Sequence, residues 1–500
     1  MYMAKNIKIK ADGLKTIRSV DPMLVSYNIE MTEVTGGTFW KEYTEGQKAG
    51  TEKFPFIAFA GMDKLMQVYP PIDLTNTRIR KLAKEIGPAW IRVSGTWSTK
   101  TYYDFDETTN GVAPEGFQNV LTKTQWLALL DFVKEVNGKL LISVANCEGI
   151  HSASEPWNPS QAEKIFNLSK EYGVPIAAAE FMNEPNLLAY SGAPKGYTFD
   201  DYIRDQDVFN AWLHENYPEV LAVGPCSIGG GQMGKIKMEE GLMKLLGRKF
   251  GTEILLKGSK EKMEVFSYHY YNGVSERITA KMHALHWPVE KAHTEEYLGA
   301  AGYCARAAAA CRDKYMPGAP MWVTESGDAG GGGCTWASTY LDVLRTLNEL
   351  GTFATISDGV IFHNTLASSD YGWLKHGTFV PRPNYFAIIL WNRLVGTTVY
   401  DSEIPISEGA HVFCHSRKDG KDGYTYAIIN NSLTETTTVE LPKEAVRYSL
   451  DGNGNIRSTT AYLNGEALAL GEGDTLPALE GIAVSGTIEL APGSCTFLVM

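Results

Sequence analysis

Two glutamates in this chain each follow a short apolar run that is typical of a buried strand. Glu184 lies within residues 181–186, and Glu325 lies within residues 322–327. Their separation corresponds to roughly three strand–helix units of a large parallel barrel. If both strands belong to one such barrel, both carboxylates open onto the same face. A pair of carboxylates there is the minimal machinery for cutting a glycosidic bond.

The chemistry of a retaining glycosidase gives each carboxyl group a separate role. One group protonates the leaving oxygen, and the other attacks the anomeric carbon as an anion. We predict that Glu184 is the acid/base and Glu325 the nucleophile, with Asn183 bonding the sugar 2-hydroxyl. Taken alone, Asn-Glu-Pro also fits a helix N-terminus, and a glutamate before a Ser-Gly turn is common. The two motifs together, on strands four and seven, favour the catalytic interpretation.

A glycine run follows the second glutamate and could bind an anion. Residues 330–333 are four consecutive glycines, which let backbone N–H groups approach a ligand closely. Successive N–H groups can form an anion-binding concavity. This would suit a sugar carboxylate in an otherwise acidic chain, although a flexible loop tip is the alternative.

Other predicted strand ends carry groups that could assist the pair. Residues 268–271 end the sixth strand, where a tyrosine could hold the nucleophile ionised and His269 could act directly or in support. Arg92 needs a carboxylate partner inside a barrel; we expect it to orient or balance the glutamates, with an ordinary ion pair as the alternative. Glu30 could accept bonds from sugar hydroxyls, and residues 369–373 offer aromatic rings to a sugar.

Strand-like and helix-like segments alternate through the first four-fifths of the chain. This alternation predicts an α/β fold, a (β/α)8 TIM barrel. The expected strands are residues 23–29, 89–93, 140–145, 176–181, 220–223, 264–268, 320–324 and 358–362. The helix-like segments between them include residues 75–86, 124–136, 159–172, 202–216 and 336–350.

The pattern changes after residue 396 to short alternating segments separated by Asp-Gly and Asn-Gly turns, which predicts a β-sandwich. Two further strand-like segments, residues 6–10 and 17–20, precede the barrel and are expected to join that sandwich. The predicted division is therefore residues 1–20 for the N-terminal strands, 21–395 for the catalytic barrel and 396–500 for the β-sandwich.

Charge and composition limit the classes of partner that we expect and the compartment in which the protein works. The net charge of −12 argues against nucleic acid and anionic membranes. The N-terminus shows no apolar signal region, and seven scattered cysteines without a C-x-x-C pair fit a reducing compartment, so we expect a cytoplasmic protein. The sequence leaves the oligomeric state open.

No cofactor is expected, because there is no phosphate-binding loop and no dinucleotide fingerprint. No metal is expected either. His283, His286, Glu290 and His293 fall close together, but Pro288 interrupts any helix that would align them.

The motifs resemble those of glycoside hydrolase family 79, the heparanase and β-glucuronidase family, over nearly the whole chain. The resemblance rests on residues 88–96, 183–186, 269–271 and 324–326, and more weakly on residues 462–465 and 475–477 of the sandwich. It implies a retaining mechanism and a β-linked glucuronic acid as the bound sugar. It also implies that Tyr371, Gly331 and Gly332 hold the sugar carboxylate, that Tyr270 contacts the nucleophile, and that Glu30 and Thr96 contact sugar hydroxyls.

The chain departs from heparanase in two ways. Basic residues within 257–262 and 281–291 are scattered among other types, and residues 31–70 form a long insertion after the first strand. The insertion would wall off one side of the cleft, which favours an exo-acting β-glucuronidase over an endo-acting heparanase-like hydrolase. Another retaining glycosidase, such as a xylanase or glucosidase, and a carbohydrate-binding protein without turnover remain as alternatives.

Overall fold

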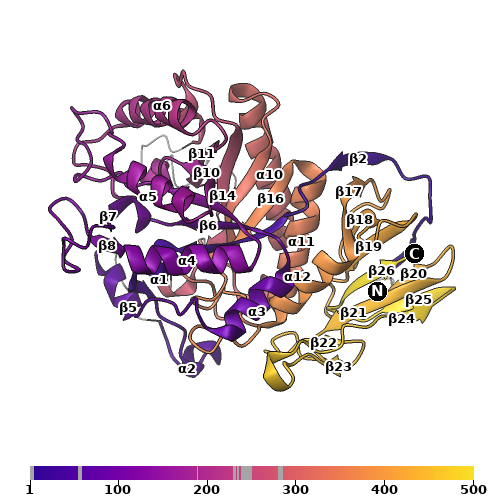
Figure 1. Ribbon diagram of the computed structural model, residues 1–500. Helices are drawn as coiled ribbons and strands as arrows, with labels where there is room; N and C mark the ends of the chain where they lie inside the picture. The colour runs from indigo at the N-terminus through magenta and orange to yellow at the C-terminus, as the bar shows by residue number, and fades with distance from the viewer. Residues whose placement is uncertain are drawn as a thin grey trace.

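Eight parallel strands close into a barrel in a computed structural model that describes residues 5–54, 59–188, 190–228, 232–233, 236–237, 251–279 and 285–500 (Figure 1). Each strand pairs with the next along the chain, and the last pairs with the first. The predicted TIM barrel is therefore confirmed. Its strands are β3 (Val25–Glu30), β6 (Trp90–Ser94), β9 (Lys139–Ser143), β10 (Ile176–Glu180), β11 (Leu221–Ile228), β14 (Val265–Val274), β15 (Met321–Gly330) and β16 (Asp358–His363).

Helices cover the outside of the barrel, and local sequence sets where they begin. In α4 (Lys123–Glu135), Thr122 and Gln125 form a reciprocal capping box. The buried side chains of this helix include Trp126 and Leu129, which belong to the same hydrophobic core as side chains of the barrel strands. The other principal helices are α3 (Thr77–Ile86), α5 (Ser160–Glu171), α6 (Phe199–Asn216), α10 (Glu295–Tyr315), α11 (Leu341–Ile356) and α12 (Pro383–Leu394).

The C-terminal segment forms a β-sandwich that includes both N-terminal strands. β1 (Lys5–Lys8) pairs in parallel with β20 (Thr437–Glu440), which also pairs with β25 (Thr487–Leu490). β2 (Thr16–Ser19) adds to the edge of the larger sheet through β17 (Val395–Tyr400). That sheet continues through β18 (His411–Arg417), β19 (Tyr424–Ile429), β26 (Cys495–Val499), β21 (Ala445–Asp451), β22 (Tyr462–Leu463) and β23 (Glu466–Ala467), with β24 (Ile482–Val484) on β21.

Helix α11 lies between the barrel and the sandwich (Figure 1). Its residues from Leu341 to Ala354 are buried without a break, because one side packs on the barrel and the other on the sandwich. Gly351 has the Phe413 ring of β18 where a Cβ atom would stand. The absence of a side chain at Gly351 therefore lets the sandwich approach the helix closely.

The insertion after the first barrel strand forms short elements above the C-terminal ends of the strands. α1 (Met31–Thr35) leads into a hairpin of β4 (Gly37–Trp40) and β5 (Met66–Tyr69), with α2 (Glu45–Lys48) between them. Two further short pairs are β7 (Thr101–Asp104) with β8 (Asn119–Thr122), and β12 (Gln232–Met233) with β13 (Ile236–Lys237). The short helices α8 (Glu253–Leu256) and α9 (Glu276–Thr279) complete the described helices.

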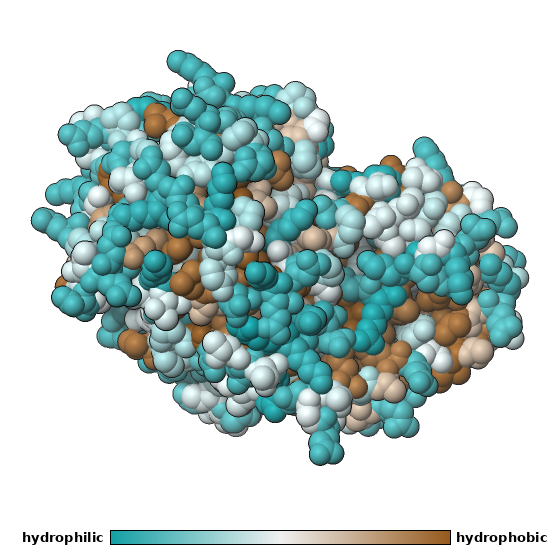
Figure 2. Space-filling model, viewed as in Figure 1, coloured by the Kyte–Doolittle hydropathy of each residue, from teal (hydrophilic) through white to brown (hydrophobic). Residues whose placement is uncertain are grey.

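The surface is largely polar. The face in Figure 2 is mostly hydrophilic, and hydrophobic residues are most evident at the lower right, over the sandwich. Within the described residues, no helix combines the length and apolar character needed to cross a membrane.

Candidate active site

Glu184 occupies a tight turn just beyond the fourth barrel strand. Its backbone is left-handed (φ 48°, ψ 54°) at the start of a short 3-10 turn, Pro185–Leu187, a conformation that costs energy for a residue with a side chain. Two hydrogen bonds hold the turn: its N–H donates to Cys226 O at 3.1 Å, and its carbonyl accepts from Ser191 Oγ at 2.8 Å. The carboxylate is thereby held at the C-terminal mouth of the barrel.

Glu325 lies inside the seventh strand, whereas the sequence places it at the strand's end. β14 and β15 stay paired as far as Val274 and Gly330, so this part of the sheet extends above the barrel. Glu325 is 5% exposed. The nucleophile candidate therefore sits on a rigid paired strand, while Glu184 sits on a turn.

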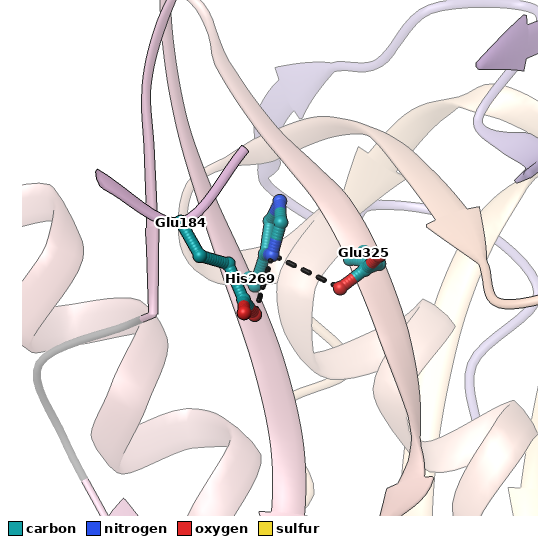
Figure 3. Close-up of side chains that lie close together, drawn as sticks. All are labelled: Glu184, His269 and Glu325. Atoms are coloured by element: carbon teal, nitrogen blue, oxygen red, sulfur yellow. Dashed lines mark hydrogen bonds and ion pairs between the residues drawn. The ribbon is translucent and has the colours of Figure 1, made fainter. Parts of the chain in front are cut away.

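His269 of β14 lies between the two glutamates (Figure 3). Its Nδ1 is 3.1 Å from Glu184 Oε1 and 3.0 Å from Glu325 Oε2. These three groups each offer one atom within 4.8 Å of the others. The predicted pair and the predicted histidine thus meet at one point.

The electrostatic surroundings make Glu325 an anion. Burial opposes its charge, but the charge and hydrogen bond of His269, with Arg92 and a hydrogen bond from Tyr271, lower the pKa of Glu325 to about 2. Burial also opposes a charged His269, yet the charge of Glu325 and hydrogen bonds to both glutamates raise the pKa of His269 to about 9. At neutral pH, Glu325 is therefore ionised and His269 Nδ1 carries a proton.

The spacing of these three groups would also suit a metal ion. However, a protonated Nδ1 has no lone pair to give to a metal. With Nδ1 protonated, the three groups form a hydrogen-bonded acid–base cluster.

Arg92 lies beneath the cluster, and its main partner is a residue that the sequence did not single out. Its Nη2 is 2.5 Å from Glu180 Oε1, while its Nη1 is 3.5 Å from Glu325 Oε1. Arg92 and Glu180 are both fully buried. Ser94 and the Cys226 thiol donate to Glu180 at 2.7 Å each. Arg92 thus forms a structural ion pair with Glu180, and its positive charge also stabilises the Glu325 anion.

Arg92 also fixes the orientation of Asn183. Its Nη2 donates to Asn183 Oδ1 at 2.8 Å. With the oxygen engaged, the Nδ2 group of Asn183 is turned to donate elsewhere. This is the orientation that the predicted bond to a sugar hydroxyl requires.

The prediction that Tyr270 contacts the nucleophile is wrong by one position. Tyr270 points away from the cluster: its ring packs on Phe353 of α11, and its buried hydroxyl has no partner among the described residues. Tyr271 is the one that donates a hydrogen bond to Glu325. Successive side chains of a strand alternate between faces, so Tyr271 shares the face of His269.

Asn364, which follows the eighth strand, joins the tyrosines and Glu30. Its Nδ2 lies 2.9 Å from Tyr271 Oη and 3.2 Å from Tyr371 Oη, and it bonds the Glu30 carboxyl. Burial and the charge of Glu325 raise the pKa of Glu30. Glu30 and Tyr371 therefore lie beside the glutamate cluster, and their contacts with a sugar stay predictions.

The glycine loop is held from behind by an arginine. The Gly332 carbonyl accepts from Ser369 Oγ at 2.9 Å and from Arg277 Nη2 at 3.4 Å. The same Nη2 is 2.8 Å from Asp370 Oδ2. Gly331 and Gly332 both have a φ of +91°, and among the described residues their N–H groups donate to no protein acceptor. Loops from three strands thus present these two N–H groups.

The insertion packs against this loop. A Cβ on Gly332 would lie 2.7 Å from Trp40 Cβ, and Trp40 clusters with Tyr371. The Tyr43 ring stacks 3.9 Å from the Arg277 guanidinium. Residues 55–58 of the predicted insertion lie outside the described residues. Thr96, the other predicted hydroxyl contact, is half-buried beyond β6.

Sequence reasoning missed several residues of the site. For three of them the sequence held a signal. Glu180 is a charged residue at the end of the apolar run 176–180, Tyr271 lies two residues after His269 on the same strand, and Asn364 is an amide that follows the eighth strand. Nothing in the local sequence marked Arg277, because its role depends on contacts among three loops. The set comprises Glu180, Tyr271, Arg277, Asn364 and Asp370. Of the histidines in residues 283–293, His286 hydrogen-bonds Thr279 and His293 hydrogen-bonds the Asn431 carbonyl. His283 lies outside the described residues.

Comparison with known proteins gives the site a context. No family model matches the chain. Heparanase-like protein 1 of Arabidopsis thaliana is 25% identical over 494 residues, covering 86% of this chain and 85% of that protein. A hyaluronoglucuronidase of Hirudo nipponia is 24% identical, covering 90% and 94% of the two chains.

A solved structure shares the fold over its whole length. The 4-O-α-L-rhamnosyl-β-D-glucuronidase of Fusarium oxysporum superposes with a TM-score of 0.65 at 12% identity, covering 99% of this chain and 100% of that one. With near full-length relatives of this kind, the chain is a glycoside hydrolase that is similar to the heparanase and β-glucuronidase family, glycoside hydrolase family 79.

Proposed function

We propose that the protein is a retaining, exo-acting β-glucuronidase. The observation that carries the proposal is the approach of Glu184 and Glu325 to within 4.8 Å, oxygen to oxygen, across His269. Retaining enzymes hold their carboxyl groups about 5–5.5 Å apart, whereas inverting enzymes need about 6.5–9.5 Å to admit a water. The spacing therefore supports double displacement.

The two glutamates divide the reaction between them. Glu325 attacks the anomeric carbon, since its lowered pKa keeps it an anion, while Glu184 gives its proton to the leaving oxygen. Attack forms an ester between Glu325 and the sugar. Glu184 then takes a proton from water, and the water releases the sugar with its original anomeric configuration.

The glycine loop and Tyr371 support the proposed substrate class. The N–H groups of Gly331 and Gly332, which have no acceptor in the part of the chain that the structure describes, and the Tyr371 hydroxyl can bind a sugar carboxylate without a direct cation. The Arg277–Asp370 pair behind the loop adds no net charge and serves as a brace. This supports a β-linked glucuronic acid in the site.

The exo mode rests on the insertion. Trp40 and the β4–β5 hairpin pack directly on Gly332 and Tyr371, so a sugar bound there meets a protein wall on that side. A chain end would fit against this wall, whereas an internal unit would have to continue through it.

Paired substrates and variants test the reaction. The wild type should hydrolyse 4-nitrophenyl β-D-glucuronide and leave the matching glucoside nearly untouched. Proton NMR should detect the β-anomer first. Glu325→Gln should lose at least ~10⁴-fold in kcat, because the nucleophile carries the first step. Glu184→Ala should retain activity on this good leaving group and recover further with azide. Preference for the glucoside, or a first-formed α-anomer, would refute the proposal.

Chain-length analysis tests the mode. Digestion of an unsulfated glucuronate-containing polysaccharide should release monosaccharide from the start, with little change in mean chain length. An early fall in mean length would indicate internal cuts, and the endo-acting alternative would replace the exo mode.

A further inference from the structure

A cavity of about 940 Å³ opens beside the acid/base, over the C-terminal ends of the third and fourth barrel strands. This volume is in the range of sites that bury small molecules. Part of its wall is the segment that directly follows Glu184, including Leu187 and Tyr190. The nucleophile and the glycine loop do not line it.

The cavity lies on the leaving-group side of the reaction. The acid/base must sit next to the glycosidic oxygen, so the leaving group extends from Glu184 away from the bound sugar. Tyr190 connects the two regions: it lines the cavity, and burial raises its pKa, with the charges of Glu184 and Glu325 as smaller causes. Ser191 bonds the Glu184 carbonyl at 2.8 Å, which ties this wall to the acid/base.

The lining is largely apolar. Tyr190 and Phe199 offer aromatic faces, and Leu187 offers an aliphatic one. Three charged residues line the cavity, Lys100, Lys195 and Glu148. The Glu148 carboxylate accepts a hydrogen bond from the Lys195 backbone N–H at 3.1 Å. Two lysines beside a carboxylate give little attraction for a polysulfated chain. An aromatic group, in contrast, can stack on an exposed tyrosine.

We propose that this cavity is the aglycone site and that it takes a flat, largely apolar aglycone such as a polycyclic phenol, with Tyr190 as its stacking platform. The inference rests on the proposed β-glucuronidase activity. It adds that the natural substrate is a β-glucuronide of an aromatic alcohol, and that aglycone size is recognised here and not at the sugar site.

Substrates that differ only in the aglycone test this. Phenyl and 2-naphthyl β-D-glucuronides have phenols of similar acidity, so a difference in kcat/KM reports aglycone binding. We expect the naphthyl substrate to be favoured by ~5–10-fold, consistent with one aromatic stacking contact. Tyr190→Ala should abolish that preference while changing the phenyl substrate less than ~3-fold, and Tyr190→Phe should preserve it. Tyr303→Ala, at a tyrosine of similar exposure on α10 outside the cavity, is the matched control.

Inhibition gives a second measure. Free 2-naphthol should inhibit the wild type and the Tyr303 variant, and should inhibit Tyr190→Ala at least ~5-fold more weakly. Equal kcat/KM for both aryl substrates, an unchanged preference in Tyr190→Ala, or a stronger preference for a sulfated disaccharide glucuronide would overturn the aglycone proposal. If no glucuronide is hydrolysed, the proposed function itself fails, which is a distinguishable result.

Discussion

The two central glutamates have the same side chain but different surroundings. Glu325 is buried on a strand, where His269, Arg92 and Tyr271 all stabilise its charge. Glu184 sits on a left-handed turn, and its side chain is 14% exposed. A single histidine nitrogen contacts both. The environment, and not the residue type, therefore makes one of them suited to attack as an anion.

The hydrogen bond from Tyr271 should be visible in the pH dependence of the reaction. Glu325 must be ionised to attack, and the Tyr271 hydroxyl helps to lower its pKa. Tyr271→Phe removes that bond, so the pKa of Glu325 should rise and the acid limb of the kcat/KM profile should move to higher pH, by about one unit if the bond is worth ~1.4 kcal/mol.

Its neighbour supplies the control. Tyr270→Phe removes a buried hydroxyl that has no partner among the described residues, so the acid limb should stay where it is. A shift in the Tyr270 variant, or none in the Tyr271 variant, would contradict the assignment.

At the scale of elements, the proposed carboxylate site is made by loops that follow different strands. The glycine loop follows β15, Asp370 follows β16, and Arg277 lies on α9 after β14. The insertion after β3 adds Tyr43, which bonds the Gly333 carbonyl at 2.7 Å. The position of the Gly331 and Gly332 N–H groups therefore depends on packing among loops more than on the glycine sequence itself.

Gly332→Ala tests this dependence. The new Cβ would lie 2.5 Å from Ser369 Oγ and 2.7 Å from Trp40 Cβ, so the loop must shift. We expect the KM for an aryl β-glucuronide to rise at least ~10-fold, with a smaller effect on kcat, in steady-state kinetics.

Gly318→Ala separates backbone strain from this clash. Gly318 has a similar φ of +81°, but nothing lies within 4 Å of a Cβ there. It should cost ~1 kcal/mol of stability and leave KM unchanged. Equal KM values for the two variants would show that the loop position does not control binding.

At the scale of the whole molecule, the barrel and the sandwich form one folded body. β1 and β2, from the N-terminus, complete sheets made mainly from the C-terminal segment, so the barrel lies between the two parts of the sandwich in the chain. α11 is buried between the two domains. Unfolding one domain would expose this helix, so we expect a single calorimetric transition.

Gly351→Ala should weaken that junction. Its Cβ would run into the Phe413 ring, and overpacking of this kind costs ~1–3 kcal/mol. Thermal unfolding should show a lower midpoint for a transition that remains single. Gly299→Ala, on α10 with open space around it, should instead stabilise the helix by up to ~1 kcal/mol. Two separated transitions would contradict the cooperative unit.

Much of the fold could be predicted because the spacing of apolar residues along the chain indicates strands and helices locally. Short apolar runs alternating with helix-like segments predicted all eight barrel strands, and alternating segments with Asp-Gly turns predicted the sandwich. Boundaries were less certain: β14 and β15 run past their expected ends. Strand ends are set by where pairing with a neighbour stops, which a single strand does not encode.

The sequence by itself determined that Glu184 and Glu325 share one face, since residues that follow the fourth and seventh strands of a parallel barrel open onto the same face. Only the tertiary structure decided which tyrosine serves Glu325, because a one-residue step on a strand reverses the side chain's face. It also revealed Glu180 as the partner of Arg92 and Arg277 as the brace of the glycine loop. These contacts join residues far apart in the chain, and their energies depend on burial and distance, which exist only once the chain has folded.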